Sequence, residues 1–144
     1  IHAMSRAALD HIPDGFQCVV RTAYSALVPA DKVQSIQHEG MWFDTGKPHE
    51  YLKANLRALR GEITLSLDPW TEANPKYSDS WVHKSTVGRG SIHNSIIGKD
   101  ARLSPNIKLE SCVVWDGATV PNGEYKHCIF HDGGMLQVES SLLS

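Results

Sequence analysis

A six-residue pattern repeats between residues 87 and 125, and it restricts the fold more than any other feature of the chain. An aliphatic residue opens each of five hexads, which begin at Val87, Ile97, Leu103, Val114 and Val120. Three of the five carry a small residue four positions later. Such hexads are typical of a parallel β-helix, in which each one supplies a short strand and a turn of a triangular coil. The sequence therefore predicts that the leading aliphatic residues fill the interior and that the small residues fit the corners.

A longer period supports this prediction. Segments 93–97, 110–114 and 126–130 share the order polar, polar, small, aliphatic, apolar, and they start 17 and then 16 residues apart. That spacing is close to the three hexads of one full coil. The stretch from Val82 to Val87 is one residue short, so we expect an irregular first coil. A solenoid needs about three repeats or more to hold together, so we expect this short one to pack against residues 1–65 or another subunit.

Residues 48–61 give the clearest helix signal. Pro48 suits the first helical position, because its missing N–H would be unpaired there. Leu52, Leu56 and Leu59 form one apolar stripe, which favours core packing over a binding face. Gly61 is a natural C-terminal cap.

The remainder of the first 65 residues reads as alternating short elements. Ser5 is expected to cap a helix over 6–12 through its hydroxyl, and Val20, Tyr24 and Leu27 lie on one face of a second helix. Short strands are predicted over 1–4, 33–37, 41–43 and 62–67. The pattern is that of an α/β unit.

Asp44 ends the apolar segment 41–43 and precedes a Thr-Gly turn. Open α/β sheets bind ligands at the carboxyl ends of their strands, so this carboxylate is a candidate ligand group. The competing interpretation is a surface or helix-capping carboxylate near Pro48, which the residues alone favour because Asp is a preferred capping residue.

The order of these features resembles the sugar-1-phosphate nucleotidyltransferases, including mannose-1-phosphate guanylyltransferases. The resemblance rests on Trp42-x-Asp44-x-Gly46, a helix that begins at Pro48 and contains Tyr51-Leu52-x-Ala-Asn, and the hexads that follow. It covers nearly all of the chain except the tail. It implies the closing part of a Rossmann-like α/β domain joined to a parallel β-helix of left-handed winding.

The resemblance also implies a reaction. Members of the family join an NTP to a sugar 1-phosphate, giving an NDP-sugar and pyrophosphate, with Mg²⁺ neutralising the phosphates. One of the two metal-binding Asp residues of the family matches Asp44. Thr45 and Gly46 would shape the turn beside it, and Trp42 would pack behind it, so these three are the candidate substrate-binding residues.

Several family features have no counterpart in this sequence. They are the Gly-rich triphosphate loop G-x-G-T-R, the first metal-binding Asp and the sugar-phosphate Lys, which in the family lie upstream of the matching residues. Lys47 also stands where Thr is common. We therefore expect this chain alone to be inactive, with NTP and sugar 1-phosphate bound through an N-terminal part. The alternative is a non-catalytic β-helix that serves as an oligomerisation or regulatory module, and a homo-oligomer is expected in either case.

Histidines suggest two further alternatives. His83, His93, His127 and His131 could form a zinc site between subunits, but they do not show the matching i, i+5 pair that such a site needs on neighbouring coils. His93 is the best candidate for the general base of a hexapeptide acyltransferase, and a solvated corner histidine is the favoured interpretation.

Composition narrows the remaining possibilities. A net charge of -2 gives no indication of a nucleic-acid partner. No apolar run is long enough for a membrane span and no signal peptide is present, so a cytoplasmic protein is expected. Cys18, Cys112 and Cys128 cannot all pair within the chain and form no C-x-x-C motif, which favours reduced, mostly buried thiols.

The predicted organisation has four parts. They are the end of a nucleotidyltransferase domain (1–65), a linker (66–80), the β-helix (81–130) and an unassigned tail (131–144). The linker is expected from two Pro-containing breaks, at 68–70 and 74–76. Trp70, Trp81 and Trp115 are expected to pack at contacts between units or subunits.

Overall fold

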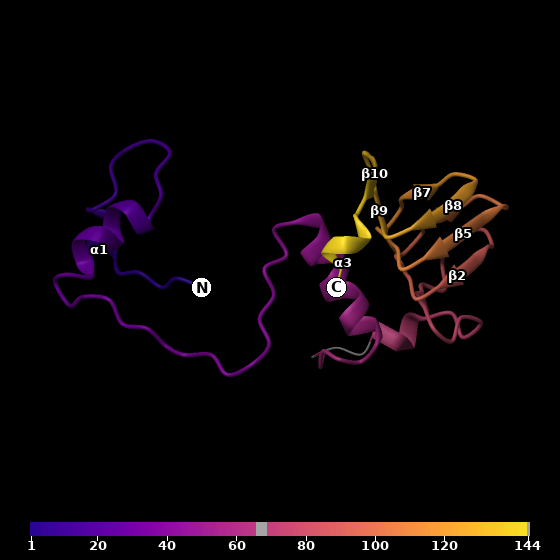
Figure 1. Cartoon of the computed structure of the whole chain (residues 1–144), viewed down its shortest axis with the longest axis horizontal. Helices are drawn as coiled ribbons and strands as arrows, with labels where there is room; N and C mark the ends of the chain where they lie inside the picture. Colours follow the sequence, from indigo (N-terminus) through magenta and orange to yellow (C-terminus); the bar gives the residue numbers. More distant parts are fainter. Residues whose placement is uncertain (66–68, 144) are drawn as a thin grey trace. The chain divides into compact units, whose positions relative to one another are not determined.

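The computed structural model describes residues 1–65 and 69–143. The chain divides into two compact units, residues 1–40 and 41–144 (Figure 1). The predicted division into residues 1–65, a linker over 66–80, the β-helix over 81–130 and a tail over 131–144 stays a prediction. Among the described residues, no helix combines the length and the apolar character needed to cross a bilayer.

The first unit contains short helical segments. They are α1 (Arg6–Leu9), the π-helical turn η1 (Val20–Tyr24) and α2 (Ser25–Leu27). Ala8, Ala23 and Leu27 form its small buried cluster. The predicted helix over 6–12 is confirmed in its first part only, and the Ser5 hydroxyl makes no capping hydrogen bond.

The Rossmann-like α/β fragment expected over residues 1–65 is not seen. The strands predicted over 1–4, 33–37 and 41–43 do not form, and 62–65 is also without strand structure. The last two residues of the strand predicted over 62–67 lie outside the described residues. A strand is stable only when a neighbour accepts and donates its backbone hydrogen bonds, and no segment among the described residues 1–65 fills that role.

Helix α3 (Pro48–Leu59) forms as predicted and ends in a complete Schellman motif. The N–H of Gly61 donates to the carbonyl of Ala58 at 3.0 Å, and the N–H of Glu62 donates to that of Arg57 at 3.0 Å. Gly61 adopts a φ of 75°, and the backbone of a residue with a Cβ atom would be strained in this conformation. The Glu62 carboxylate also pairs with Arg57 at 2.8 Å and Arg60 at 2.6 Å.

Residues 81–137 form a parallel β-solenoid of about three coils with three sheets (Figure 1). Its strands are β1 (Trp81–Val82), β2 (Ser91–His93), β3 (Ile96–Ile97), β4 (Arg102–Leu103), β5 (Ile107–Glu110), β6 (Val113–Val114), β7 (Thr119–Val120), β8 (Gly123–Lys126), β9 (Cys128–His131) and β10 (Gly134–Gln137). The sheets have the orders β1-β3-β6-β9-β10, β2-β5-β8 and β4-β7. The parallel β-helix is therefore confirmed, whereas its left-handed winding stays a prediction.

The register of the sheets follows the longer sequence period. Ile97 pairs with Val114, and Val114 with Phe130, so equivalent residues stack directly above one another. Four of the five leading aliphatic residues are buried, as predicted. Val87 is the exception and is 63% exposed. The backbone of Val87 forms a parallel bridge with Arg102 in the next coil. Val87 lies in the coil that the sequence predicts to be irregular, and its side chain points outward.

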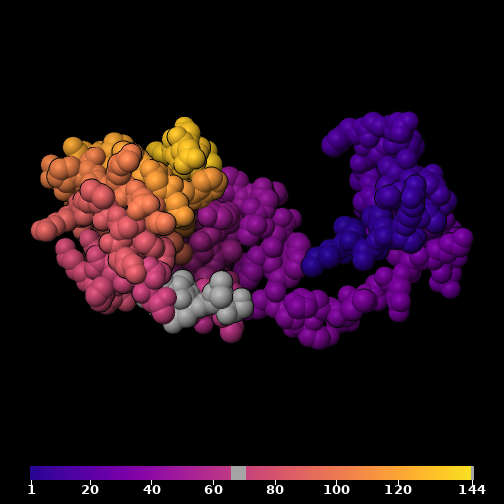
Figure 2. Space-filling model, turned by 180° about the vertical axis from the view of Figure 1, so that it is seen from behind, coloured from indigo at the N-terminus to yellow at the C-terminus, as the bar shows by residue number. Residues whose placement is uncertain are grey.

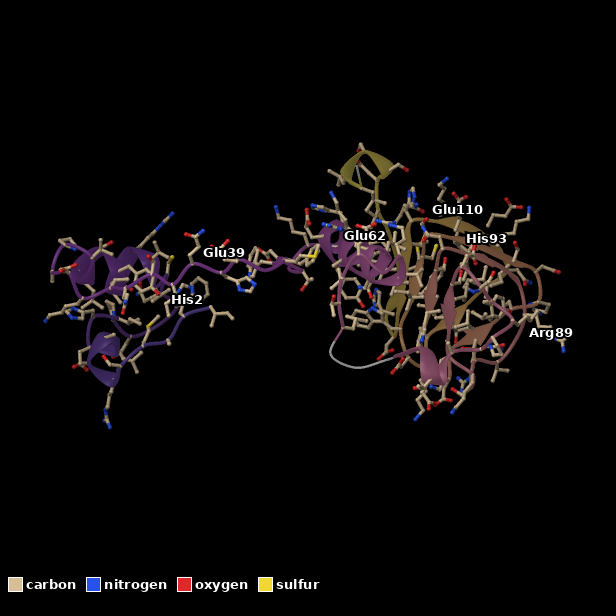
Figure 3. The ribbon with its side chains drawn as sticks, turned by 90° about the horizontal axis from the view of Figure 1, so that it is seen from below. His2, Glu39, Glu62, Arg89, His93 and Glu110 are labelled. Carbon is tan, nitrogen blue, oxygen red and sulfur yellow. The ribbon has the colours of Figure 1, made fainter. Side chains whose placement is uncertain are left out.

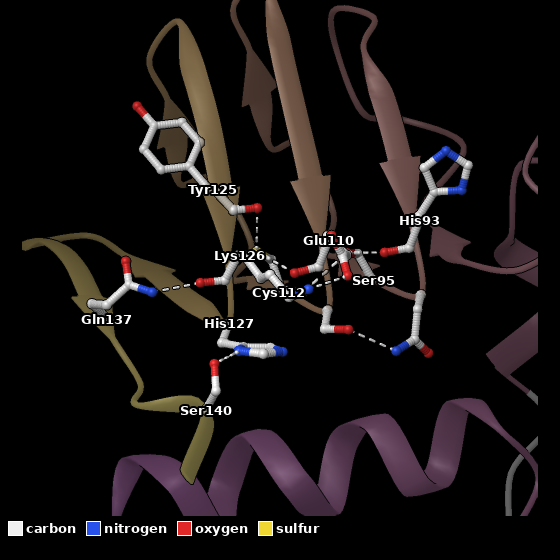
Figure 4. Close-up of polar contacts among 11 residues, drawn as sticks. His93, Ser95, Glu110, Cys112, Tyr125, Lys126, His127, Gln137 and Ser140 are labelled. Atoms are coloured by element: carbon white, nitrogen blue, oxygen red, sulfur yellow. Dashed lines mark hydrogen bonds and ion pairs between the residues drawn. The ribbon is translucent and has the colours of Figure 1, made fainter. Parts of the chain in front are cut away.

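A ladder of small polar side chains runs through one corner of the interior, and Figure 4 shows two of its members, Ser95 and Cys112. The N–H of Ser95 donates to the Ser80 hydroxyl at 3.2 Å, that of Cys112 to Ser95 at 3.0 Å, and that of Cys128 to the Cys112 sulfur at 3.4 Å. The side chains of Ser95, Cys112 and Cys128 each also donate a hydrogen bond to the backbone carbonyl of the residue two positions earlier. The ladder satisfies backbone groups that the corner leaves without strand partners.

The residue before each of these three takes a left-handed conformation. Asn94, Ser111 and His127 have φ values of 45°, 53° and 54°. The Asn94 amide donates to the Ser111 hydroxyl of the next coil at 2.8 Å. The repeated positive φ turns the chain sharply at the same corner of each coil.

Antiparallel pairing ends the parallel stacking at both ends of the largest sheet. Ala73 bridges His83 in antiparallel fashion beside β1, after the short helix η2 (Pro69–Glu72). At the other end β10 pairs antiparallel with β9 and ends the parallel stacking. The tail, which the sequence left unassigned, thus contributes β10 and the turn η3 (Ser140–Leu142).

Helix α3 covers the outer face of this sheet. Leu52 and Leu56 are buried against Val113, Ile129 and Val138. The C-terminal segment packs on the same cluster through Leu143, and Figure 2 shows this yellow segment beside the helix. The prediction that the solenoid packs against part of residues 1–65 is confirmed for α3.

Candidate functional site

Asp44 lies in the extended segment that leads into α3. Its Oδ1 accepts a hydrogen bond from the N–H of Gly46 at 3.1 Å, which makes a local turn over Thr45. Lys47, rather than Asp44, occupies the N-cap position of α3. The carboxylate is exposed, so its second oxygen is available to a ligand from the solvent side.

A hollow of about 350 Å³ surrounds this carboxylate. It is lined by Trp42, Phe43, Asp44, Lys47, His49 and Glu50. The volume lies in the range of small-molecule sites. Of the predicted substrate-binding residues, Trp42 lines the hollow, whereas Thr45 and Gly46 form the turn at its edge.

The walls of the hollow are held by α3. The Arg57 guanidinium lies 5.2 Å from the centroid of the Phe43 ring, a cation–π contact that ties the segment before Asp44 to the helix. His49 and Glu50 approach to 3.5 Å. Trp42 remains 68% exposed, so its indole face is accessible. Sequence reasoning missed His49, Glu50 and Arg57, which only the fold brings beside the Trp42-x-Asp44 segment.

Mg²⁺ is the metal ion that the resemblance implies for Asp44. Mg²⁺ keeps several waters and uses one or two carboxylates together with substrate phosphates, and Asp44 offers one exposed carboxylate oxygen with no other partner in the described structure. Within residues 1–65 and 69–143, no group of three or more His, Cys, Asp or Glu side chains is arranged to hold a metal. Asp44 can therefore supply one ligand of such a site.

The four histidines considered as zinc ligands contact different partners. His83 contacts Ser85 at 2.8 Å, and His127 contacts Ser140 at 2.9 Å (Figure 4). The ring of His131 packs on Trp115. His93 pairs with Asp79 at 3.1 Å and is 67% exposed, so the favoured interpretation of a solvated corner histidine describes it well.

Two of the three tryptophans expected at contacts, Trp81 and Trp115, lie at a groove between α3 and the solenoid. Trp115 meets the Tyr51 ring edge-on at a centroid distance of 6.3 Å. Trp81 and Trp115 both line a groove of about 410 Å³ beside Tyr51 and Asn55. The side chain of Trp70 lies outside the described part of the structure.

Comparison with known proteins supports the resemblance found in the sequence. The chain is similar to a mannose-1-phosphate guanylyltransferase of Mycobacterium tuberculosis (strain ATCC 25618 / H37Rv), with 26% identity over 129 residues. The match covers 85% of this chain and 34% of the relative, so the chain spans about a third of that protein's length. No family model matches the chain.

Proposed function

We propose that this chain is part of a sugar-1-phosphate nucleotidyltransferase, which joins an NTP and a sugar 1-phosphate to form an NDP-sugar and pyrophosphate. The similarity to the guanylyltransferase over 85% of the chain carries this proposal. The placement of Asp44 before a helix that packs on a parallel solenoid supports it, since that is the order of elements the resemblance implies. The protein acts in the cytoplasm under this proposal.

Asp44 is the proposed metal ligand. Bound Mg²⁺ would neutralise charge on the transferring phosphates, and catalysis of this kind consists mostly of positioning and electrostatic stabilisation. The Gly46 N–H holds one carboxylate oxygen at 3.1 Å and so orients the other. The exposed Trp42 indole and Lys47 at the same hollow would contact the substrate side of the site.

The 144-residue chain alone is proposed to be inactive. It lacks the Gly-rich loop and the first metal-binding Asp that the resemblance requires, and a single carboxylate does not align two phosphate-bearing substrates. The NTP and the sugar 1-phosphate would bind through residues that this sequence does not contain.

A direct assay separates these claims. NDP-sugar formation is measured with the four common NTPs, a panel of sugar 1-phosphates and Mg²⁺, for the 144-residue chain and for the product of the whole reading frame that encodes it. We expect no turnover by the chain alone and Mg²⁺-dependent turnover by the whole product. Turnover by the chain alone would refute its inactivity, and a whole product without turnover would refute the nucleotidyltransferase assignment.

A further inference from the structure

The sheet β2-β5-β8 presents a charged outer face, which we define by six outward-pointing side chains in two rows. The first row is Ser91, Lys108 and Glu124, and the second row is His93, Glu110 and Lys126. Figure 3 shows His93 and Glu110 on the same side of the solenoid. The rows lie two residues apart along each strand, about 6.6 Å.

The charges on this face are held in place by their neighbours. Lys108 pairs with Glu124 at 2.6 Å, and Lys126 pairs with Glu110 at 2.6 Å, each across adjacent strands. All four side chains are more than half exposed. Between the rows lies a trough of about 640 Å³, because the intervening residues point into the core.

We propose that this face binds the same face of a second copy of the chain, with the two solenoids side by side and their axes parallel. The two-fold axis runs parallel to the stacking direction and passes over the trough between the rows. This operation keeps each strand opposite its own copy and exchanges the two rows, and its two-fold symmetry makes the contact isologous.

The exchange places opposite charges together at every charged position. Lys108 of one copy faces Glu110 of the other, and Glu124 faces Lys126, and the symmetry repeats both contacts. Each carboxylate then lies between an ammonium of its own chain and one of the second copy.

The alternative face-to-face arrangement is unfavourable. A two-fold axis along the strands would keep each row opposite the same row and reverse the order of the strands. The central strand β5 of one copy would then face β5 of the other, with Lys108 opposite Lys108 and Glu110 opposite Glu110. Like charges directly opposite one another repel. The charge pattern therefore selects one orientation among the two.

The contact rests on exposed ion pairs, each of which stabilises only weakly. The dimer should accordingly be sensitive to salt, because the Debye length falls from about 14 Å at 50 mM ionic strength to about 4 Å at 500 mM. Sedimentation velocity of the full 144-residue chain at high micromolar concentration should show dimer at the lower ionic strength and monomer at the higher one. This proposal does not depend on the catalytic one.

A charge-exchanged variant provides the matched control. Combining Lys108→Glu, Glu110→Lys, Glu124→Lys and Lys126→Glu preserves both ion pairs within the chain and the complementarity of the face with itself. We expect this variant to dimerise like the wild type. Mixed with the wild type, however, it places Lys opposite Lys and Glu opposite Glu.

Fluorescence energy transfer between differently labelled copies measures this preference. We expect transfer within each protein and at least tenfold less between wild type and variant at equal concentration. Absence of dimer at low salt would overturn the proposal. So would free mixing of the two proteins, or association that persists at 500 mM salt, because both would mean that another surface, such as the exposed apolar residues of the first unit, makes the contact.

Discussion

The backbone N–H of Cys112 donates a hydrogen bond of 3.0 Å to the hydroxyl of Ser95, one coil earlier in the solenoid interior. Both residues are fully buried. The contact makes a side chain of one coil the acceptor for the backbone of the next, so the coils are coupled through their corners as well as through their strands.

Replacing Ser95 with alanine should therefore destabilise the solenoid. The Cys112 N–H would lose its acceptor inside the core, at a cost of about 1–3 kcal/mol in the free energy of unfolding. Urea denaturation measures this change. Ser95→Cys should cost less, because cysteine fills the equivalent position in the next two coils, and Ser91→Ala on the exposed face should change stability by less than about 0.5 kcal/mol. Equal effects of Ser95→Ala and Ser91→Ala would contradict the ladder.

Packing of α3 on the solenoid predicts a second effect. Leu52 is fully buried against the sheet, so Leu52→Ala should lower the free energy of unfolding by about 2–5 kcal/mol. Leu65→Ala removes the same atoms from a side chain that is 50% exposed and should have little effect. If the helix were not part of the folded unit, the two substitutions would behave alike in thermal denaturation.

Gly61 should tolerate substitution poorly. Its φ of 75° strains any residue with a Cβ atom, and Gly61→Ala should cost about 1–2 kcal/mol. Gly61→Asn should cost less, since asparagine enters this region more readily. A larger loss for asparagine than for alanine in chemical denaturation would argue against the helix end described above.

The three thiols should differ in reactivity. Burial raises the pKa of Cys112 to about 12 and also raises the pKa of Cys128, whereas Cys18 is exposed. Only the thiolate is nucleophilic, so one thiol should react with a disulfide reagent at pH 8 in the native protein and all three after unfolding. The folded Cys18→Ser variant should show no rapidly reacting thiol. A rapid reaction in that variant would contradict the burial of Cys112 and Cys128.

Acid should weaken the fold. A hydrogen bond from Lys126 lowers the pKa of Glu110, and one from Arg60 lowers that of Glu62. A depressed carboxyl pKa contributes stability above the unfolded value, near 4.5, that is lost as pH falls through the folded value. The melting temperature should therefore fall between pH 5 and pH 3, and Glu110→Gln should reduce the size of that fall. An unchanged fall in the variant would mean that this carboxylate contributes nothing measurable.

The sequence predicted best where structure is determined locally. Ile97, Val114 and Phe130 stack because the same pattern recurs once per coil, and α3 follows from Pro48, its leucine stripe and Gly61. Prediction failed for the strands expected in the first 65 residues, because a strand depends on partners elsewhere in space. The antiparallel β10 was missed for a related reason, since all four of its residues are exposed and show no alternation.

The candidate site was predictable only in part. Asp44 and Trp42 were found from a family pattern and lie at one hollow. Glu50 and His49 join them because the chain turns at Gly46 into α3, and Arg57, near the end of α3, makes a cation–π contact with Phe43, which precedes the helix. The contact between Arg57 and Phe43 depends on how the segment before α3 lies against the helix, which a single sequence does not reveal.

The most direct test of the central claim is the effect of Asp44→Asn on NDP-sugar formation by the whole reading-frame product. We expect kcat to fall by about 100-fold or more with Mg²⁺ present, because a ligand for the metal at the phosphates is lost, while the melting temperature stays unchanged. Asp132→Asn, at another exposed carboxylate, serves as the control and should leave kcat unchanged. A kcat for Asp44→Asn within twofold of the wild type would contradict the account.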